Sequence, residues 1–141
     1  MNKKRLVTRK QAEKLKELGF KEKVCHYQMS DLSVGVSYPR DWNNEAVPYG
    51  LDNIVNYPYL SIPTVDEAIE WLINKLDKRQ EFFYYDVKKD TEFLSEKITY
   101  YCTIDVLDNL ERTFTKKRNS IYSAKKDLIN KLIKMIKLYQ K

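Results

Sequence analysis

Few residues of this chain are of the types that do covalent or metal chemistry: it holds one histidine, His26, and two cysteines, Cys25 and Cys102. Cys25 and His26 are adjacent, but successive side chains of a strand point to opposite faces, so the two cannot act together as nucleophile and base. A zinc site needs three or four suitably spaced ligands, and these residues supply no such set. We therefore predict buried, reduced thiols, an ordinary strand histidine, and no metal or other cofactor.

Carboxylates are the other candidates for chemistry, and Asp66, Glu67 and Glu70 lie close together in one predicted helix. Their position in the first turns already accounts for them, because negative charge there meets the positive end of the helix macrodipole. The chain also has only three glycines, without the spacing of a loop that cradles phosphate. We predict no catalytic residue and a protein that is not an enzyme. A small enzyme of unknown class is the third alternative.

Charge is sorted by position along the chain. Residues 1–23 carry nine Lys/Arg against three Asp/Glu, residues 24–111 carry seven against sixteen, and residues 112–141 carry ten against one. Clustered cations attract nucleic acid or another anionic surface because they neutralise phosphates. The same basic ends can instead fold back over the acidic middle of the molecule. The sequence leaves both alternatives open.

Nucleic-acid binding is therefore one predicted function. The candidate residues are the cations of the two basic blocks, together with one tyrosine whose ring offers a stacking face. They are Lys3, Lys4, Arg5, Arg9, Lys10, Arg112, Lys116, Lys117, Arg118, Lys125, Lys126 and Tyr101. The alternative interpretation is that the lysines form a solvated helix face and the tyrosine packs.

The segment from residue 37 to residue 63 lacks a helical period and is rich in asparagine, proline and aromatic residues. Such a long irregular stretch is functional or conceals a further element. Its aromatic residues offer large contact areas with few rotatable bonds, as interface anchors do. The candidates are Tyr38, Trp42, Tyr49, Tyr57 and Tyr59. The first predicted function is therefore binding of a protein partner through residues 38–63, and nucleic-acid binding is the alternative. The competing interpretation of this segment is that its aromatic residues cover the core.

The elements that must position these residues are readable from local patterns. Thr8 with Gln11 forms a capping box that opens a helix over residues 9–18, and Gly19 with Phe20 ends it in a Schellman-type stop. The other expected elements are a hairpin over residues 24–36, a helix over 65–77, strands over 82–87 and 98–106, a basic turn over 113–120, and a helix capped by Ser123 that runs to about residue 139.

We predict one α+β domain over residues 1–141, with three helices packed on an antiparallel sheet of three to five strands. The strand over 98–106 places five apolar residues on one face and a polar and aromatic set, Thr99, Tyr101, Thr103 and Asp105, on the other. This second face is a candidate for solvent exposure. In the last helix, Ile133 and Leu138 widen the apolar arc, which predicts either packing on two neighbours or self-association.

Three segments, TRKQAEKLKELGF, YLSIPTVDEAIEWL and YSAKKDLINKLIKMI, each combine a helix with its boundary residues. They resemble the helix signatures of a group of small uncharacterised proteins encoded by phages and mobile elements of gut bacteria. The matching positions are Leu15, Gly19, Phe20, Pro63, Thr64, Ala68, Trp71, Leu72 and Leu128. This chain departs from the group by a longer Asn-Pro-Tyr segment and a more basic C-terminal block. The resemblance implies an order of elements and a genomic setting, and no activity.

No apolar run approaches the ~20 residues that cross a bilayer, and the basic start MNKKR leads into charged helix sequence rather than an apolar signal core. We therefore expect a cytoplasmic protein that does not contact a membrane. The sequence leaves open whether it is a monomer or a homodimer, and which protein or nucleic acid is its partner.

Overall fold

The structure is a computed structural model that describes residues 3–28, 33–43, 59–77, 83–92, 94, 97–106 and 111–139. The chain divides into two compact units, residues 6–64 and residues 65–141 with 1–5. The described residues contain three α-helices and two antiparallel three-stranded sheets. The α+β class is thus confirmed, but the strands form two sheets where the sequence predicted one.

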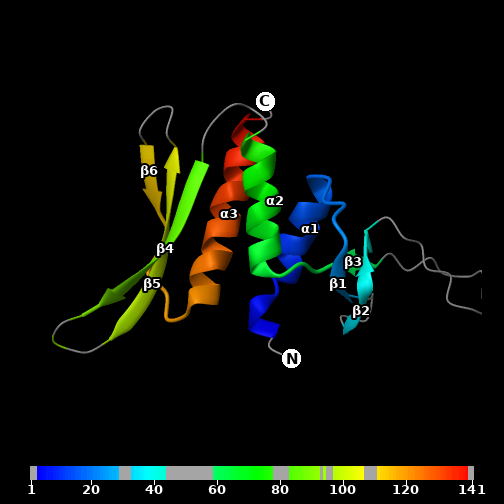
Figure 1. Ribbon diagram of the computed structural model, residues 1–141, viewed down its shortest axis with the longest axis horizontal. Helices are drawn as coiled ribbons and strands as arrows, with labels where there is room; N and C mark the ends of the chain where they lie inside the picture. The colour runs from blue at the N-terminus through cyan, green and yellow to red at the C-terminus, as the bar shows by residue number, and fades with distance from the viewer. Residues whose placement is uncertain are drawn as a thin grey trace, which may run out of the picture. The chain divides into compact units, whose positions relative to one another are not determined.

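The unit of residues 6–64 contains one helix and a sheet with the strand order β2-β1-β3 (Figure 1). Its elements are α1 (Arg9–Glu17), β1 (Val24–Gln28), β2 (Val34–Arg40) and β3 (Leu60–Ser61). The predicted hairpin is confirmed by the antiparallel pairing of β1 with β2. The short strand β3 is an element that the irregular segment conceals. Two residues are too few to show a period, and only their pairing with β1 defines them.

Helix α1 begins and ends as its sequence predicts. The Thr8 hydroxyl accepts the Gln11 N–H at 3.1 Å, and the Gln11 side chain accepts the Thr8 N–H at 3.1 Å, which completes the capping box. Gly19 takes a φ of 93°, in the region that favours glycine. The Phe20 N–H then donates to the Leu15 carbonyl at 3.0 Å, as in a Schellman stop.

Three aromatic side chains of this unit pack together over the β1–β2 hairpin. The Tyr27 ring lies 4.2 Å from the Trp42 ring and 5.2 Å from the Tyr59 ring, centroid to centroid. Trp42 is only 5 % exposed, and its Nε1–H donates to the Val24 carbonyl at 2.8 Å. A buried indole whose N–H is satisfied by backbone stabilises the unit that contains it.

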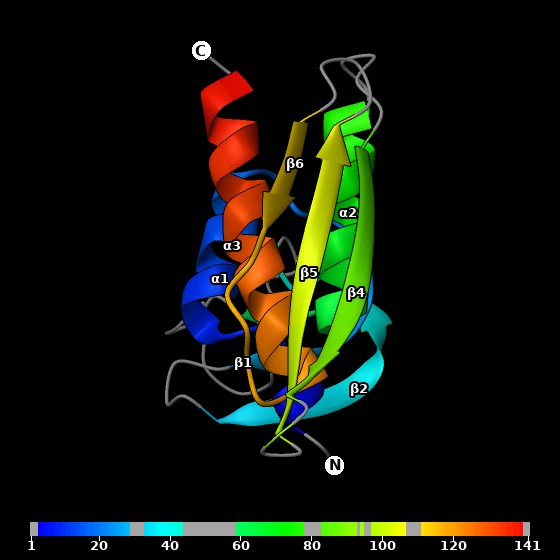
Figure 2. The same cartoon turned by 90° about the vertical axis from the view of Figure 1, so that its left-hand side faces the viewer.

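The second unit places two helices on one face of its sheet (Figures 1 and 2). Its elements are η1 (Lys3–Arg5), α2 (Val65–Asp77), β4 (Phe83–Thr91), β5 (Ile98–Val106), β6 (Glu111–Phe114) and α3 (Ile121–Tyr139). The strand order is β4-β5-β6, so β5 is central. Helix α3 packs against both α2 and β5. This arrangement supports packing on two neighbours for Ile133, which is buried, but not for Leu138, which is 68 % exposed.

The core of this unit lies between α2, α3 and β5. Ile69, Leu72, Ile104, Leu128 and Leu132 are fully buried. Truncating such a residue to alanine removes apolar contacts and leaves a cavity, at a cost of about 2–5 kcal/mol. The apolar stripes of the two helices, read from the sequence, therefore determine which of their faces turn to the sheet.

Two predictions for the C-terminal third need correction. The Ser120 hydroxyl accepts the Ser123 N–H at 3.1 Å, so Ser120 caps α3, and the predicted cap Ser123 lies in the first turn. The predicted basic turn over 113–120 is also shorter, because its first residues belong to β6. A four-residue strand shows too little alternation to be recognised without its partner β5.

Gly35 generates the first prediction, because a Cβ at this position would overlap the Tyr27 ring. Trp42 and Tyr59 pack against this half-buried ring, so moving it would disturb the aromatic cluster. We expect Gly35→Ala to lower the free energy of unfolding by about 1–3 kcal/mol in urea denaturation. In a Tyr27→Ala background the same substitution should cost close to nothing. An equal cost in both backgrounds would show that the ring is not the obstacle.

Candidate binding surface

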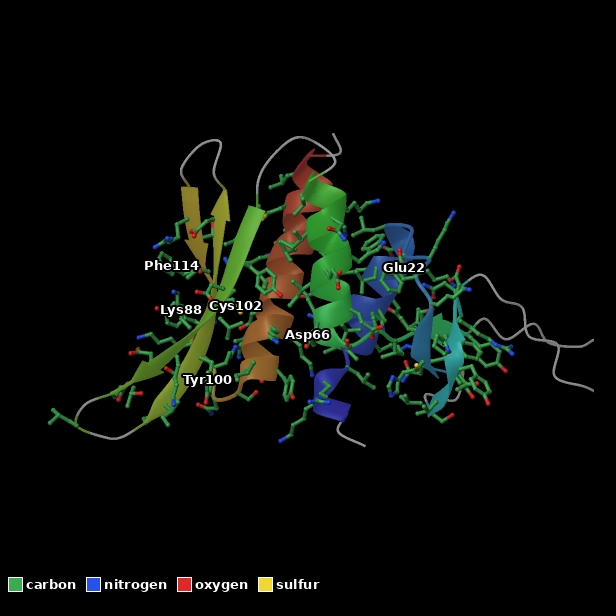
Figure 3. The ribbon with its side chains drawn as sticks, viewed as in Figure 1. Glu22, Asp66, Lys88, Tyr100, Cys102 and Phe114 are labelled. Carbon is green, nitrogen blue, oxygen red and sulfur yellow. The ribbon has the colours of Figure 1, made fainter. Side chains whose placement is uncertain are left out.

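The pairing of β5 with both neighbours decides which side chains of the second sheet share a face, because residues opposite each other in an antiparallel pair lie on one side. We call the face turned away from α2 and α3 the outer face; Figure 3 shows Phe114 and Lys88 on it. Its side chains are Asp86, Lys88 and Asp90 on β4, Thr99, Tyr101, Thr103 and Asp105 on β5, and Arg112 and Phe114 on β6.

An aromatic pair occupies the middle of the outer face. Phe114 is 55 % exposed, and its ring lies 6.2 Å from the ring of the half-buried Tyr101, centroid to centroid. The predicted exposure of the β5 residues on this face is only partly correct. Thr99 and Thr103 are buried, and Thr103 lies between Asp86 and Phe114 of the two neighbouring strands. Larger side chains on both sides cover a short threonine on a central strand.

A β-bulge follows β6 and interrupts its pairing with β5. The two strands keep one register up to Phe114, but the next pair, Tyr100 with Arg118, is out of that register by one residue. The extra residue is accommodated at Thr115, whose N–H donates to the Cys102 carbonyl at 2.9 Å. The Thr115 hydroxyl accepts the Cys102 N–H at 2.7 Å. Both backbone groups of Cys102 are thereby satisfied by one residue.

The bulge also separates the side chains of the basic run 116–118, which are adjacent in the sequence, so that they point to different faces of the sheet. Lys117 forms an ion pair with Asp90, on the outer face, at 2.5 Å. Its neighbour Arg118 turns to the helices and forms a pair with Asp127 of α3 at 2.6 Å. Adjacent cations therefore serve two different faces of the sheet.

Each described cation of the outer face has a carboxylate partner. The Arg112 guanidinium donates to the two oxygens of Asp105 at 2.6 and 3.2 Å, and Lys88 lies 2.9 Å from Asp86. The hydrogen bonds from these cations hold the pKa of Asp105 and of Asp86 below the usual value. With the Lys117 pair, three cations are matched by three carboxylates, so these groups leave the surface without net charge.

The remaining cationic candidates are distributed over both units. Lys3, Lys4 and Arg5 form η1, while Arg9 and Lys10 belong to α1 in the other unit. The Arg5 guanidinium donates to the Tyr122 hydroxyl at 3.0 Å, and Lys125 pairs with Asp66 at 2.6 Å. Lys116 is exposed and Lys126 half-buried. The structure thus attaches several predicted cations to partners inside their own unit.

In the unit of residues 6–64 the structure brings Arg9, a nucleic-acid candidate, together with Tyr59, an aromatic candidate. Both line an open groove along α1 and β3, with Glu13, Lys16, Glu17 and Leu60. The Arg9 guanidinium is held there by Glu13 at 3.0 Å and by the Gln28 side chain at 2.7 Å. The groove therefore presents charges of both signs, and its arginine already has partners.

The aromatic candidates of residues 38–63 separate into different roles. Tyr38 is 81 % exposed, whereas Trp42 is buried and Tyr59 half-buried in the cluster with Tyr27. Tyr49 and Tyr57 lie outside the described residues. Among the three described residues, Trp42 and Tyr59 therefore fit the interpretation that aromatic residues cover the core. Tyr38 alone of these three exposes most of its side chain to solvent.

The two cysteines belong to different units, Cys25 to β1 beside His26 and Cys102 to β5. Both cysteines are free; Cys102 is fully buried as predicted, and Cys25 is half-buried. Among the described residues, no three His, Cys, Asp or Glu side chains are arranged to hold a metal ion. Burial raises the pKa of the Cys102 thiol to about 11.

Sequence reasoning missed Phe114 and Lys88 as surface residues. Phe114 lay in the predicted basic turn, and the alternation of Thr113, Phe114 and Thr115 was the one local signal for a strand there. Lys88 follows the predicted end of its strand, although β4 continues to residue 91.

The comparisons with known proteins add no relative to this picture. No family model, curated protein or solved structure matches the chain. Within the described residues, no helix is long and apolar enough to pass through a bilayer.

The bulge generates a second prediction. Replacing Thr115 by valine removes the oxygen that accepts the buried Cys102 N–H, and an unsatisfied buried donor costs about 1–3 kcal/mol. We expect Thr115→Val to lower the free energy of unfolding by this amount in chemical denaturation. Thr113→Val, at an exposed position of the same strand, is the matched control and should change stability little. Equal effects would mean that the hydroxyl contact does not support the bulge.

Cys102 generates a third prediction. The thiolate is the reactive form, and a pKa of about 11 in a buried site keeps the thiol neutral at pH 8. Iodoacetamide at pH 8, followed by peptide mass spectrometry, should modify Cys102 only after denaturation.

Because the folded state holds the proton of the Cys102 thiol more tightly than the unfolded chain, folding stability should also fall as the pH rises from about 9 to about 11. A Cys102→Ala variant should lose less stability over that range; rapid native alkylation of Cys102 would contradict the burial.

Proposed function

We propose that the protein is a non-enzymatic binding module whose contact surface is the outer face of the β4-β5-β6 sheet. Its partner is a protein segment that carries an apolar or aromatic side chain between acidic residues. The exposed Phe114 beside Tyr101, on a sheet face that none of the described helices of the same unit covers, is the observation that carries this proposal.

The aromatic pair supplies the centre of such an interface. Aromatic residues dominate the binding energy of protein interfaces when they lie near the middle, where surrounding contacts exclude water. Here the ion pairs of Arg112 with Asp105 and of Lys117 with Asp90 lie on either side of the pair along the strands. A partner side chain placed on Phe114 would therefore be enclosed by a polar rim.

The exposure of the charged groups favours an acidic partner. The Arg112 side chain is 60 % exposed and its partner Asp105 31 %, while Lys117 is 61 % exposed and Asp90 37 %. In these two pairs, which flank the aromatic pair, the cation is the more exposed partner; in the third pair the order is reversed, with Asp86 63 % and Lys88 48 % exposed. Acidic residues on both sides of an apolar residue would complement this arrangement.

Single-stranded nucleic acid is the second candidate, and the aromatic pair favours it because bases stack on exposed rings. The charge balance of the outer face argues for the protein partner instead. Phosphate contacts supply most of the affinity for nucleic acid, and each described cation of this surface already has a carboxylate beside it. The acidic residues of a peptide would compete with the same carboxylates, but a peptide takes most of its binding energy from the contact with the aromatic pair, whereas a nucleic acid depends on the phosphate contacts.

Other parts of the proposal come from the sequence. A contact through residues 38–63 is retained for the exposed Tyr38, which offers a second aromatic surface. A cytoplasmic location is proposed because both cysteines are free thiols, and an origin in a phage or mobile element rests on the helix signatures.

The proposal is tested by titrating the isotope-labelled protein with short peptides and recording backbone amide shifts by NMR. The probe peptide has the sequence Asp-Asp-Phe-Asp-Asp, and the matched probes replace its Phe by Ser or its acids by Lys. We expect the acidic aromatic peptide to shift the amides of Tyr101, Arg112 and Phe114. Phe114→Ala should remove these shifts while leaving the thermal melt unchanged, because the side chain is exposed.

Three outcomes would count against this partner. Equal shifts with the lysine peptide would remove the acidic requirement, and shifts that survive Phe114→Ala would place the contact elsewhere. Shifts produced by oligothymidylate and by no peptide would replace the protein partner with single-stranded nucleic acid. Their loss on raising the salt concentration would identify phosphate contacts.

A further inference from the structure

Strand β4 forms a long and regular edge of its sheet. It pairs with β5 over nine residues in one register and without a bulge, and no described strand pairs with its other side. Proteins usually shorten, bulge or cover such an edge, because its unpaired N–H and C=O groups bind another strand. The opposite edge shows this protection, since β6 has four residues and a bulge follows it. The β4 edge is neither short nor bulged; its protection consists of charged side chains, which include Asp86 and Lys88.

The hydrogen-bond pattern fixes which residues of β4 direct their backbone groups outward. The Glu92 N–H donates to the Lys97 carbonyl at 2.9 Å, so Glu92 and Lys97 form a hydrogen-bonded pair. In the same register, the even-numbered residues of β4 direct their backbone N–H and C=O groups to β5. Cys102, which lies opposite Val87, directs its N–H and C=O to Thr115 on the other side. Both observations leave the odd-numbered residues of β4, with Val87 at their centre, pointing their backbone groups to the outer edge. The Val87 N–H donates to the Asp86 side chain at 2.8 Å, so a second strand that pairs here must replace this bond.

The charges of β4 make this edge complementary to itself in one register. If two copies pair antiparallel about Val87, Asp86 of each copy lies opposite Lys88 of the other. These are non-hydrogen-bonded pairs, in which side chains approach most closely. Moving the centre by one residue places Asp86 opposite Asp86, or Lys88 opposite Lys88, and like charges in direct opposition are unfavourable.

The same register also accommodates the neighbouring residues. It places Lys89 of one copy opposite Tyr85 of the other, and the Tyr85 side chain is 40 % exposed in the single chain. A lysine stem can cover part of such a ring and keep its ammonium in water. The Lys88 ammonium already lies 2.9 Å from Asp86 on the same strand, so both charges are on the outer face, where a second copy can engage them.

We propose that the protein forms a two-fold symmetric dimer in which the β4 strands of two copies pair antiparallel about Val87. The two sheets then become one six-stranded sheet, and every contact occurs twice, as in other isologous interfaces. Pairing uses the edge of the sheet, so the aromatic pair on each outer face stays uncovered. This inference does not depend on the peptide-binding proposal.

Charge reversal at two positions tests this dimer by sedimentation velocity, over protein concentrations up to about 100 µM. The native chain should show a concentration-dependent dimer. Asp86→Lys places lysines opposite lysines, and Lys88→Asp places carboxylates opposite carboxylates, so each should raise the dimer dissociation constant at least about tenfold. Glu22→Lys, at an exposed residue of the other unit, makes the same charge change as Asp86→Lys and should leave the dimer intact.

Mixing the two variants gives the most specific test. Asp86→Lys carries lysine at positions 86 and 88, and Lys88→Asp carries aspartate at both. When the two variants pair, each lysine therefore lies opposite an aspartate. An equimolar mixture of Asp86→Lys and Lys88→Asp should form heterodimers, and the double variant Asp86→Lys/Lys88→Asp should dimerise with itself. A native chain that stays monomeric throughout the concentration series would overturn the proposal. So would a dimer that neither single substitution weakens, or two variants that do not associate when mixed.

Discussion

The central position of β5 is the constraint on which the second unit depends. One face of this strand is sealed by α3, with Cys102 and Ile104 fully buried, and both of its edges are paired. Because side chains alternate along a strand, burying one set forces Tyr101, Thr103 and Asp105 to the opposite side. The positions of Phe114 and Arg112 on β6 then follow from register alone. The outer face is thus a consequence of how the core is packed.

The same constraint explains what happens to the basic C-terminal block. The sequence leaves open whether its cations face a polyanion or fold over the acidic middle. In the structure, Arg112, Lys117 and Lys125 each pair with an aspartate from that middle segment. Exposed ion pairs add little to stability. On the outer face, the pairs of Arg112 and Lys117 balance the charge around the aromatic pair.

Two kinds of surface on one sheet suggest a division of roles. In the two proposals, the outer face would select a partner through the shape and charge of its side chains, whereas the β4 edge would select a second copy through backbone register. Asp86 and Lys88 belong to both surfaces. A dimer through the edge would place two aromatic pairs on one continuous sheet, so a partner with two matching segments would bind more tightly than one with a single segment.

The sequence by itself determined the helices, because caps, stops and apolar stripes act within a few residues. The Thr8 box, the Gly19 stop and the bounds of α2 follow from such local patterns. Only the tertiary structure decided that the strands form two sheets, that Trp42 is buried, and that Phe114 lies beside Tyr101. Each of these depends on pairing between distant segments, and the bulge that separates Lys117 from Arg118 depends on register with β5. Register depends on the hydrophobic patterns of two paired strands together and on the geometry of the turn between them, so it cannot be read from the local composition of one segment.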